Sequence, residues 1–350
     1  MVLDARGTTP SGPIHGLTSH AQLDARHHGA RIDTCPVALL ETIGGTPLVD
    51  VSLLLDHRRT APGVRLLAKL EGFNPTGSVK DRIALSMITD AQERGVLTPG
   101  RTILEPTSGN TGISLAFVGR LLGHPVRAVL PDNATPERVQ MMRTYGAEVV
   151  FSDGELGSNG AVALAKELSA QDPSLYMPMQ YENPANPLAH YETTAVELLE
   201  QVEDRRIHAF VAGLGTGGTL MGVGRRLVEH DRRTQVVAAE PKPGDAIMGL
   251  RSLEAGYVPP ILDTSRLTRR IYVTNRHSVL GTRSLAGVGV FTGVSAGAAA
   301  QVARLIATEA PRDSCVVFLC ADSGWKYLSA DLFARDLDDL EEHMDAGHWW

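Results

Sequence analysis

The stretch Asn74-Pro-Thr-Gly-Ser-Val-Lys-Asp-Arg82 brings one lysine, Lys80, to the point where a turn changes into an apolar helical pattern. Asparagine, proline, glycine and serine favour turns, and residues 83–93 carry apolar side chains at helical spacing. Only five of the 33 basic residues are lysines. A lysine amine, unlike an arginine, attacks a carbonyl carbon once burial or nearby positive charge lowers its pKa. We therefore expect at Lys80 either a reactive amine or an ordinary surface charge, unfavourably placed at a helix N-terminus.

The composition is that of a globular protein with one large core or two cores of ordinary size, since 43% of the 350 residues are hydrophobic. The net charge of -7 argues against non-specific binding to nucleic acid. Because no apolar stretch is long enough to cross a bilayer and no signal segment is recognisable, we expect a cytoplasmic protein with no membrane partner. Cys35, Cys315 and Cys320 predict reduced thiols, and no closely spaced histidines and cysteines indicate a metal site.

Short apolar runs alternate with helical stretches from residue 37 onward. The predicted strands are 65–70, 102–104, 126–130, 148–151, 208–212, 235–239, 271–273 and 315–319. The predicted helices are 83–93, 113–122, 136–145, 161–169, 189–202, 220–229 and 296–308. This alternation predicts an α/β fold with two lobes, each a twisted, mostly parallel sheet flanked by helices. Residues 1–36 have no such pattern and predict a disordered extension, and 246–268 predict an irregular excursion.

Three glycine-rich turns each lie between a predicted strand and a predicted helix, where parallel-sheet enzymes place their ligands. In Gly213-Leu-Gly-Thr-Gly-Gly-Thr219, glycines let backbone N–H groups converge on an anion, and the two threonines add hydroxyl donors. The turn has neither the ending of a Walker loop nor the setting of a dinucleotide fingerprint. It predicts a phosphate cup, and the alternative is a turn that only packs tightly.

The other two turns suggest contacts with an amino acid and with an aromatic ring. Glu105-Pro-Thr-Ser-Gly-Asn-Thr-Gly112 offers hydroxyls, an amide and helix-terminal N–H groups, which together suit a carboxylate. A simple helix cap would need fewer of these polar residues. In Gly293-Val-Ser-Ala-Gly297, Ser295 is either a cap or, next to a cofactor, a partner for a ring nitrogen.

A lysine for a Schiff base, a phosphate cup and a carboxylate loop describe pyridoxal phosphate holding an amino acid. The sequence resembles the fold type II (tryptophan synthase β-like) pyridoxal-phosphate enzymes, specifically the cysteine synthase and cystathionine β-synthase group, from about residue 39 to 328. The motifs that carry the resemblance are Gly45-Thr-Pro-Leu48, Asn74-Pro75 to Asp81-Arg82, Glu105 to Gly112, Gln180-Tyr181, Asn183-Pro-Ala-Asn186, Gly215 to Thr219, Ser295-Ala-Gly297, and Asp322-Ser-Gly with Lys326-Tyr-Leu328.

The resemblance implies a role for each matching position. Lys80 is expected to form the Schiff base and to remove the α-proton, and Asn110 to contact the phenolic oxygen of the cofactor. The other implied contacts are of the cofactor phosphate with Gly215, Thr216, Gly217, Gly218 and Thr219, of the pyridine nitrogen with Ser295, and of the substrate carboxylate with Thr107, Ser108, Thr111 and Gln180.

The same resemblance implies a division of the chain. We expect a smaller domain over 74–185, which carries the lysine and the substrate loop, and a larger domain of 37–73 plus 186–335, which carries the phosphate cup. Residues 336–350 are expected to form a tail, whose end from Asp345 to Trp350 either guards the active site or frays. Members of the group are commonly homodimers, so a homodimer is expected here as well.

The implied reaction is β-replacement on a serine derivative through an aminoacrylate intermediate. Within the group the sequence is most similar to the O-phosphoserine-dependent cysteine synthases of actinobacteria, in which an arginine matching Arg251 holds the leaving phosphate. Residues 242–245 depart from the pattern of that type, which leaves O-acetyl-L-serine as the other donor.

The sequence does not determine which nucleophile attacks the aminoacrylate. It is expected to be sulfide or a thiocarboxylated sulfur-carrier protein. The alternatives are homocysteine, which gives cystathionine, and an amine, which gives a 2,3-diaminopropionate derivative. A threonine or serine dehydratase is disfavoured because Thr111 follows Asn110 where those enzymes have histidine, and a non-catalytic relative is disfavoured because Lys80 and all three loops are present.

Overall fold

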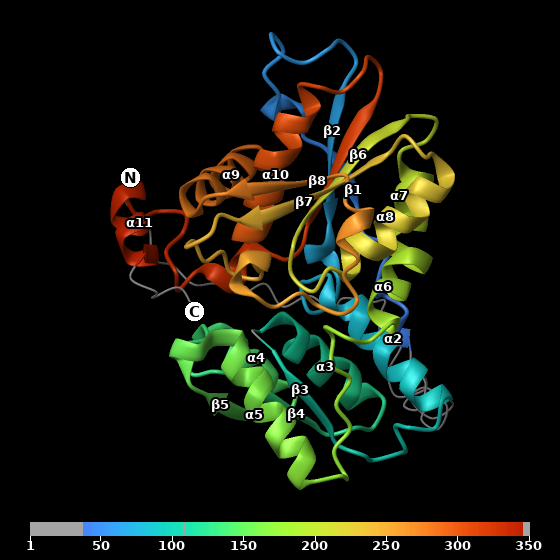
Figure 1. The fold of residues 1–350 in the computed structure, drawn as a ribbon, viewed down its shortest axis with the longest axis vertical. Coiled ribbons are helices and arrows are strands. Elements are labelled where there is room, and N and C mark those ends of the chain that lie inside the picture. Colours follow the sequence, from blue (N-terminus) through green and yellow to red (C-terminus); the bar gives the residue numbers. More distant parts are fainter. Residues whose placement is uncertain (1–37, 108, 346–350) are drawn as a thin grey trace, which may run out of the picture.

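The computed structural model describes residues 38–107 and 109–345, which form two adjoining α/β bodies, one built on a six-stranded sheet and one on a three-stranded sheet (Figure 1). The strands are β1 (Leu48–Asp50), β2 (Arg65–Leu70), β3 (Ile103–Pro106), β4 (Val126–Pro131), β5 (Glu148–Ser152), β6 (Ile207–Gly213), β7 (Gln235–Pro241), β8 (Arg269–Val273) and β9 (Cys315–Cys320). The α-helices are α2 (Lys80–Glu93), α3 (Asn110–Leu121), α4 (Pro136–Thr144), α5 (Gly157–Gln171), α6 (Ala185–Ala189), α7 (Ala195–Gln201), α8 (Gly218–His230), α9 (Asn275–Gly287), α10 (Val294–Ala307) and α11 (Leu337–Asp345).

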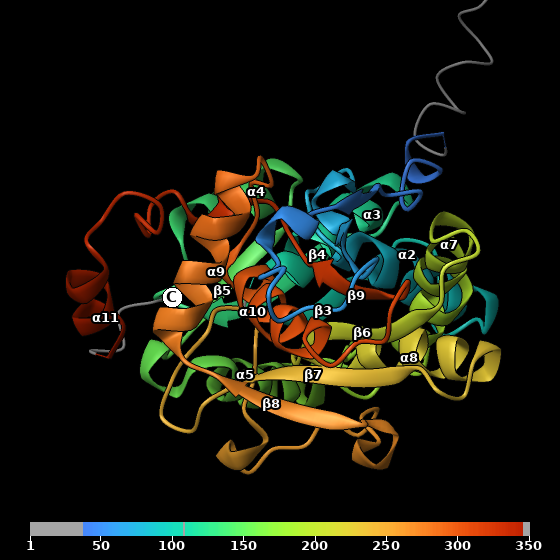
Figure 2. The same ribbon diagram turned by 90° about the horizontal axis from the view of Figure 1, so that it is seen from above.

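The larger sheet has the strand order β1-β2-β9-β6-β7-β8, and each neighbouring pair is parallel except β1 with β2. Figure 2 shows β8, β7 and β6 side by side in this order. Helices α9 and α10 cover one face, and α7 and α8 cover the other (Figure 1). Along β6, Val211 packs in the hydrophobic core between the sheet and α10. Phe210 and Ala212 pack in the core between the sheet and α8, because side chains alternate across a strand. Burial on both faces explains why these strands are apolar throughout.

The smaller sheet has the order β3-β4-β5, and both pairs are parallel. Its strands alternate in the same way, since Ala128 packs against the core that contains α2 and α3 while Val129 packs against α5. Helix α2 buries Ile83, Met87 and Ala91 in this core. The four-residue spacing of these side chains places them on one helix face and explains why the stretch after Lys80 folds as a helix.

The α/β fold class with two mostly parallel sheets is confirmed, and the differences from the predicted elements are local. Two helices, α9 and α10, lie between β8 and β9 where only one is predicted, because the polar residues of α9 hide its buried face. The predicted helix 189–202 is replaced by α6, a π-helical turn (His190–Thr194) and α7. Residues 246–268 are irregular as predicted, with short 3-10 turns at Leu253–Ala255 and Thr264–Arg266.

Several expectations fall on residues that the structure does not describe: the extension over 1–36, Cys35, Ser108 and the end of the tail, 346–350. The domain boundaries stay a prediction. Cys315 and Cys320 are free thiols in β9, and burial raises the pKa of each to about 12. Within 38–107 and 109–345, no helix is long and apolar enough to cross a membrane, and no cluster of three or more histidine, cysteine or carboxylate side chains suits a metal ion.

Candidate active site

Lys80 is the first residue of α2, and it borders a cavity that residues of both bodies line, among them Asn110 of the smaller body and Gly215 of the larger. The turn before it is held from both sides. The buried carboxylate of Asp81 accepts hydrogen bonds from the backbone N–H of Thr76, at 2.7 Å, and from the hydroxyl of Ser114, at 2.6 Å. The backbone N–H of Val79 donates to the carbonyl oxygen of Ala321, just after β9, at 2.8 Å. These contacts fix the position of the lysine relative to both sheets.

The Lys80 amine is poised to act as a nucleophile and base. It borders a cavity of about 460 Å³, and none of the described residues accepts a hydrogen bond from it. Burial lowers the pKa of Lys80, and the negative charges of Asp322 and Glu71 oppose this only in part. A neutral amine is therefore easier to reach here than on the surface.

The predicted phosphate cup connects the end of β6 to the start of α8. Gly217 has φ +88°, a left-handed conformation that glycine adopts without strain. A Cβ on Gly215 would lie 3.0 Å from the carbonyl oxygen of Gly249, a tight contact that a side chain at this position would have to relieve by a small shift of the backbone. A small hollow of about 40 Å³ is lined by the cup, Lys80 and Ser295. Lys80, Gly215, Thr216 and Ser295 line both this hollow and the larger cavity, so the lysine and the predicted phosphate cup border the same site.

The second loop brings two of its predicted residues into the cavity. Asn110 and Thr111 begin α3, and the Thr111 hydroxyl donates to Oε1 of Gln180 at 2.7 Å. The Thr107 hydroxyl instead accepts from the backbone N–H groups of Gly109 and Gly112, at 3.0 and 3.1 Å, and does not line the cavity. Thr107 therefore shapes the loop here, and its contact with a substrate stays a prediction.

Gln180 is held in the cavity by the buried carboxyl group of Glu105, a loop residue for which the sequence predicts no contact of its own. Glu105 accepts hydrogen bonds from the backbone N–H groups of Met179 and Gln180, at 2.8 and 2.9 Å. Met179 has φ +56°, an uncommon conformation for a residue with a side chain. Burial raises the pKa of Glu105 to about 8. Glu105 thus stabilises the strained turn that presents Gln180.

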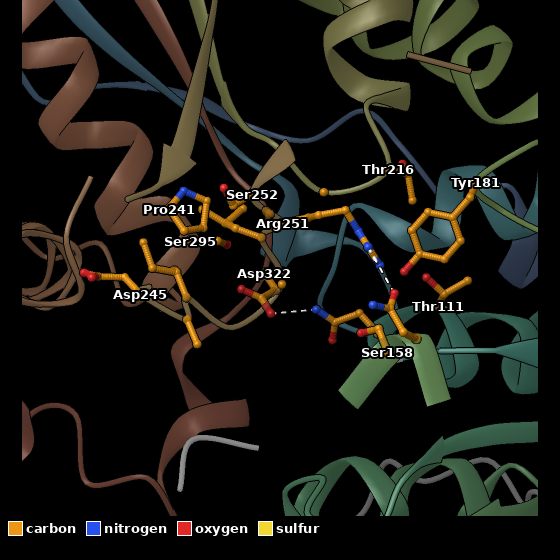
Figure 3. A pocket seen from close by; sticks show the side chains of 18 of the residues that line it. Thr111, Ser158, Tyr181, Thr216, Pro241, Asp245, Arg251, Ser252, Ser295 and Asp322 are labelled. Atoms are coloured by element: carbon orange, nitrogen blue, oxygen red, sulfur yellow. Dashed lines mark hydrogen bonds between the residues drawn. The ribbon is translucent and has the colours of Figure 1, made fainter. Parts of the chain in front are cut away.

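A second group of residues with no predicted role lies across the cavity after β9. Asn110 donates to Asp322 at 2.7 Å, drawn as a dashed line in Figure 3, and Tyr327 donates to the same oxygen at 2.8 Å. The fully buried amine of Lys326 donates to Oδ1 of Asn110 at 2.8 Å, and burial lowers its pKa to about 8. This network orients the Asn110 amide so that its N–H₂ group faces Asp322.

Arg251 enters the cavity from the irregular segment after β7. Its guanidinium carbon lies 5.3 Å from the ring centre of Tyr181 and 4.8 Å from that of Tyr257, and Nη1 donates weakly to Asn159 at 3.4 Å. Figure 3 shows the side chain reaching across the cavity toward Ser158, which lies near the N-terminus of α5. The stacking explains how a long side chain keeps one orientation here.

Most predicted site residues are therefore brought together. Those that line the cavity or its hollow are Lys80, Asn110, Thr111, Gln180, Gly215, Thr216, Gly217, Thr219, Arg251 and Ser295. Gly218, the residue of the cup that starts α8, lines neither the cavity nor the hollow, and Ser108 lies outside the described residues. The pairing of Asn110 with Asp322 and Lys326 was missed because it joins segments more than 200 residues apart, at separations of 212 and 216.

Comparison with known proteins places this site in a family. The family model for "Pyridoxal-phosphate dependent enzyme" matches residues 39–322. A cysteine synthase of Aquifex aeolicus is 41% identical over 303 residues, which cover 85% of this chain and 92% of that protein. A crystal structure of a cysteine synthase from Entamoeba histolytica is similar with a TM-score of 0.79 at 30% identity, covering 96% and 99% of the two chains. A crystal structure of an O-ureido-L-serine synthase is similar with a TM-score of 0.77 at 38% identity, covering 86% and 94%.

The chain therefore belongs to the pyridoxal-phosphate dependent enzymes of fold type II. Within them it is a member of the cysteine synthase and cystathionine β-synthase group, and it is a cysteine synthase-like enzyme of the β-replacement type. The free lysine amine, the anion cup and the polar loop around one cavity fit the cofactor of this family.

Proposed function

We propose that this enzyme makes cysteine from O-phospho-L-serine, or from O-acetyl-L-serine, with sulfide or a thiocarboxylated sulfur-carrier protein as the nucleophile. The observation that carries the proposal is the convergence on one cavity of the Lys80 amine, the cup and the Thr111–Gln180 pair, with Arg251 on the remaining side. Bound there, pyridoxal phosphate supplies an electron sink for the negative charge that develops at the α-carbon of an amino acid.

The residues of the chain divide the remaining work. Lys80 would hold the cofactor covalently and, once the amino group of the substrate has displaced it, would take the α-proton with its freed amine. Gly215 through Thr219 would bind the cofactor phosphate, Ser295 would contact the pyridine nitrogen, and Asn110 would contact the phenolic oxygen. The loop of Thr107, Ser108 and Thr111 would bind the substrate carboxylate together with Gln180. Because a serine hydroxyl is neutral, Ser295 would leave the pyridine nitrogen largely unprotonated, which would favour elimination over the wider chemistry of transaminases.

We assign the leaving group of the donor to the side of the cavity that Arg251 forms. A phosphate there would receive charge-assisted hydrogen bonds from the guanidinium, and the start of α5 with Ser158 and Asn159 adds polar groups nearby. An acetyl group carries no charge and gains less from this arrangement. The geometry thus favours O-phospho-L-serine as the donor.

Replacing Arg251 by alanine is expected to raise KM for O-phospho-L-serine by about 10- to 100-fold, because a hydrogen bond to a charged group is lost. The KM for O-acetyl-L-serine is expected to change by less than about threefold. Steady-state kinetics with both donors and saturating sulfide measure the difference. Arg266→Ala, an exposed arginine in the same irregular segment, is the matched control. An equal loss with both donors would remove Arg251 from the leaving-group site.

Parallel reactions with different nucleophiles identify the one that the enzyme uses. With the donor held saturating, the holoenzyme is offered sulfide, a thiocarboxylated carrier protein, homocysteine and small amines in parallel, and the products are separated by mass spectrometry. We expect cysteine, or its adduct with the carrier, to form fastest. Faster formation of cystathionine or of a 2,3-diaminopropionate derivative would replace this proposal with the corresponding alternative. The homodimer and the cytoplasmic location stay predictions, and light scattering of the purified protein tests the first.

A further inference from the structure

The back of the phosphate cup is formed by the segment that includes α6 and the π-helical turn. Asn186 and His190 lie one helical turn apart on this segment, and both are buried, with 1% of the surface of each residue exposed. Residues four apart share a helix face, and this face packs against α8. The oxygen of the Asn186 side chain would lie 1.9 Å from a Cβ on Gly218, which shows how closely the segment approaches the cup.

Asn186 controls the hydroxyl of Thr216. Its amide nitrogen donates one hydrogen bond to the carbonyl oxygen of Gln180, at 2.8 Å, and one to Oγ1 of Thr216, at 3.1 Å. The same Oγ1 accepts from the backbone N–H of Gly218 at 3.2 Å. A hydroxyl has two acceptor lone pairs and one hydrogen, so both lone pairs of Thr216 are occupied. Its hydrogen is left to be donated, and Thr216 borders the hollow of the cup.

His190 contacts the hydroxyl of Thr219, as Asn186 contacts that of Thr216. Its Nδ1 lies 3.0 Å from the Thr194 hydroxyl and its Nε2 lies 3.2 Å from the Thr219 hydroxyl. Burial, together with the positive charges of Arg82 and Lys80, lowers the pKa of His190 well below its ordinary value, so the ring is neutral and only one nitrogen carries hydrogen.

The two neutral forms of the ring have different consequences for the cup. With hydrogen on Nε2, Thr194 donates to Nδ1, His190 donates to Thr219, and the Thr219 hydrogen is left over. With hydrogen on Nδ1, the Thr219 hydrogen is used up on Nε2. An anion that only accepts hydrogen bonds therefore selects the first form.

We propose that Asn186 and His190 are positioning residues that make the hydroxyls of Thr216 and Thr219 hydrogen-bond donors toward the cofactor phosphate. The inference rests on the proposed assignment of 215–219 as the phosphate site. It adds two residues outside the cup that set its polarity and adapt it to a fully ionised phosphate, which has acceptors and no hydrogen to donate.

The test compares pyridoxal phosphate with pyridoxal, which lacks the phosphate, in calorimetric titrations of the cofactor-free protein. His190→Phe and Asn186→Leu are each expected to weaken pyridoxal phosphate by about 3- to 10-fold, since each removes one oriented hydrogen bond. The affinity for pyridoxal is expected to stay the same. His190→Gln keeps an N–H donor and is expected to recover part of the loss. The phosphorus resonance of the bound cofactor is expected to shift in both apolar variants.

His124→Phe is the matched control. His124 is also a buried histidine with two hydrogen-bonding contacts, to Gln92 and to the carbonyl oxygen of Arg101, but it lies beside the smaller sheet. It is expected to leave the affinity ratio of the two ligands unchanged.

The outcomes separate the inference from the site assignment. Gly217→Val disturbs the backbone of the cup, because Gly217 has φ +88°, and Thr216→Val and Thr219→Val remove only the hydroxyls. If none of these three variants weakens pyridoxal phosphate selectively, the cup is not the phosphate site and the proposed function fails at that point. If Gly217→Val does so but the two threonine variants, or His190→Phe and Asn186→Leu, do not, the inference alone is overturned. Equal weakening of pyridoxal phosphate and pyridoxal by His190→Phe would also overturn it, because that is the result of a purely structural role.

Discussion

Replacing Lys80 by alanine is expected to abolish covalent attachment of the cofactor and to lower kcat by about 10²- to 10⁴-fold or more, because the nucleophile and the base are lost together. Reduction of the holoenzyme with borohydride, followed by peptide mass spectrometry, locates the attached cofactor, and steady-state kinetics give kcat. In the natural sequence the label is expected on Lys80 and in the variant on no lysine. A variant that turned over at the normal rate would overturn the assignment of Lys80.

Lys326 is a second buried lysine near the cavity and could in principle form the Schiff base in place of Lys80. Lys326 is buried and its pKa is lowered to about 8, so pKa alone would allow it to replace Lys80. Its amine is engaged, however, in a 2.8 Å hydrogen bond to Asn110, whereas the Lys80 amine has no such partner in the described part of the chain. Lys80→Arg keeps a positive charge but cannot form a Schiff base, so it is expected to lose covalent cofactor attachment and activity as Lys80→Ala does. Lys166→Ala, at an exposed lysine, is expected to retain activity.

The parts of the site that the sequence predicts are those that depend on chain order. Lys80, the cup and the Asn110 loop stand at strand-to-helix junctions, and parallel strands carry such junctions to one edge of a sheet. Position relative to the strands is therefore enough to bring Lys80, after β2, and the cup, after β6, to one edge of the larger sheet. The Asn110 loop follows β3 of the smaller sheet, and its approach to them depends on how the two bodies pack. Strand position does not predict Arg251 as a site residue, because it lies in an irregular segment. Only the resemblance to a family indicates it.

The parts that the sequence does not predict depend on side chains from distant segments. Glu105 supports a turn more than 70 residues away, with separations of 74 and 75, and no local pattern indicates it. His190 lies in a π-helical turn, whose extra residue shifts the helical period and hides the face that His190 and Asn186 share. Asn186 belongs to a recognised motif, but its contact with Thr216 follows only from the packing of α6 on α8.

A buried network of charged side chains near Lys80 is expected to contribute strongly to the stability of the fold. Arg82 pairs with Glu71 at 2.7 Å and with Glu197 at 2.6 Å, and Lys69 pairs with Glu197 at 2.6 Å. At most 17% of any of these four side chains is exposed. The network ties α2 to α7 and β2. Removal of one member leaves a buried charge without its partner, which is more costly than the pair itself is favourable.

Replacing Glu197 by glutamine is expected to lower the free energy of unfolding at neutral pH by about 3 kcal/mol. Burial by itself would raise the pKa of Glu197, but hydrogen bonds from Arg82 and Lys69 and the charge of Arg82 lower it from 4.5 to about 2. The unfolded chain thus binds more protons between these two pH values, so this stabilisation is complete above about pH 4.5 and disappears as the pH falls toward about 2. Urea unfolding of the cofactor-free protein between pH 2 and 7 measures both effects, because this range spans the ordinary and the lowered pKa of Glu197.

The pH dependence separates this network from an ordinary ion pair. A shift from 4.5 to about 2 corresponds to about 3 kcal/mol, which agrees with the expected cost of removing Glu197. Glu148→Gln, which breaks an exposed pair with Arg127, is expected to cost less than about 1 kcal/mol. Combining Lys69→Met with Glu197→Gln is expected to restore part of the loss, because the buried cation left unpaired is removed as well. If Glu197→Gln left the acid limb of the stability curve unchanged, the carboxylate would not be the group that couples protons to the contact between α2 and α7.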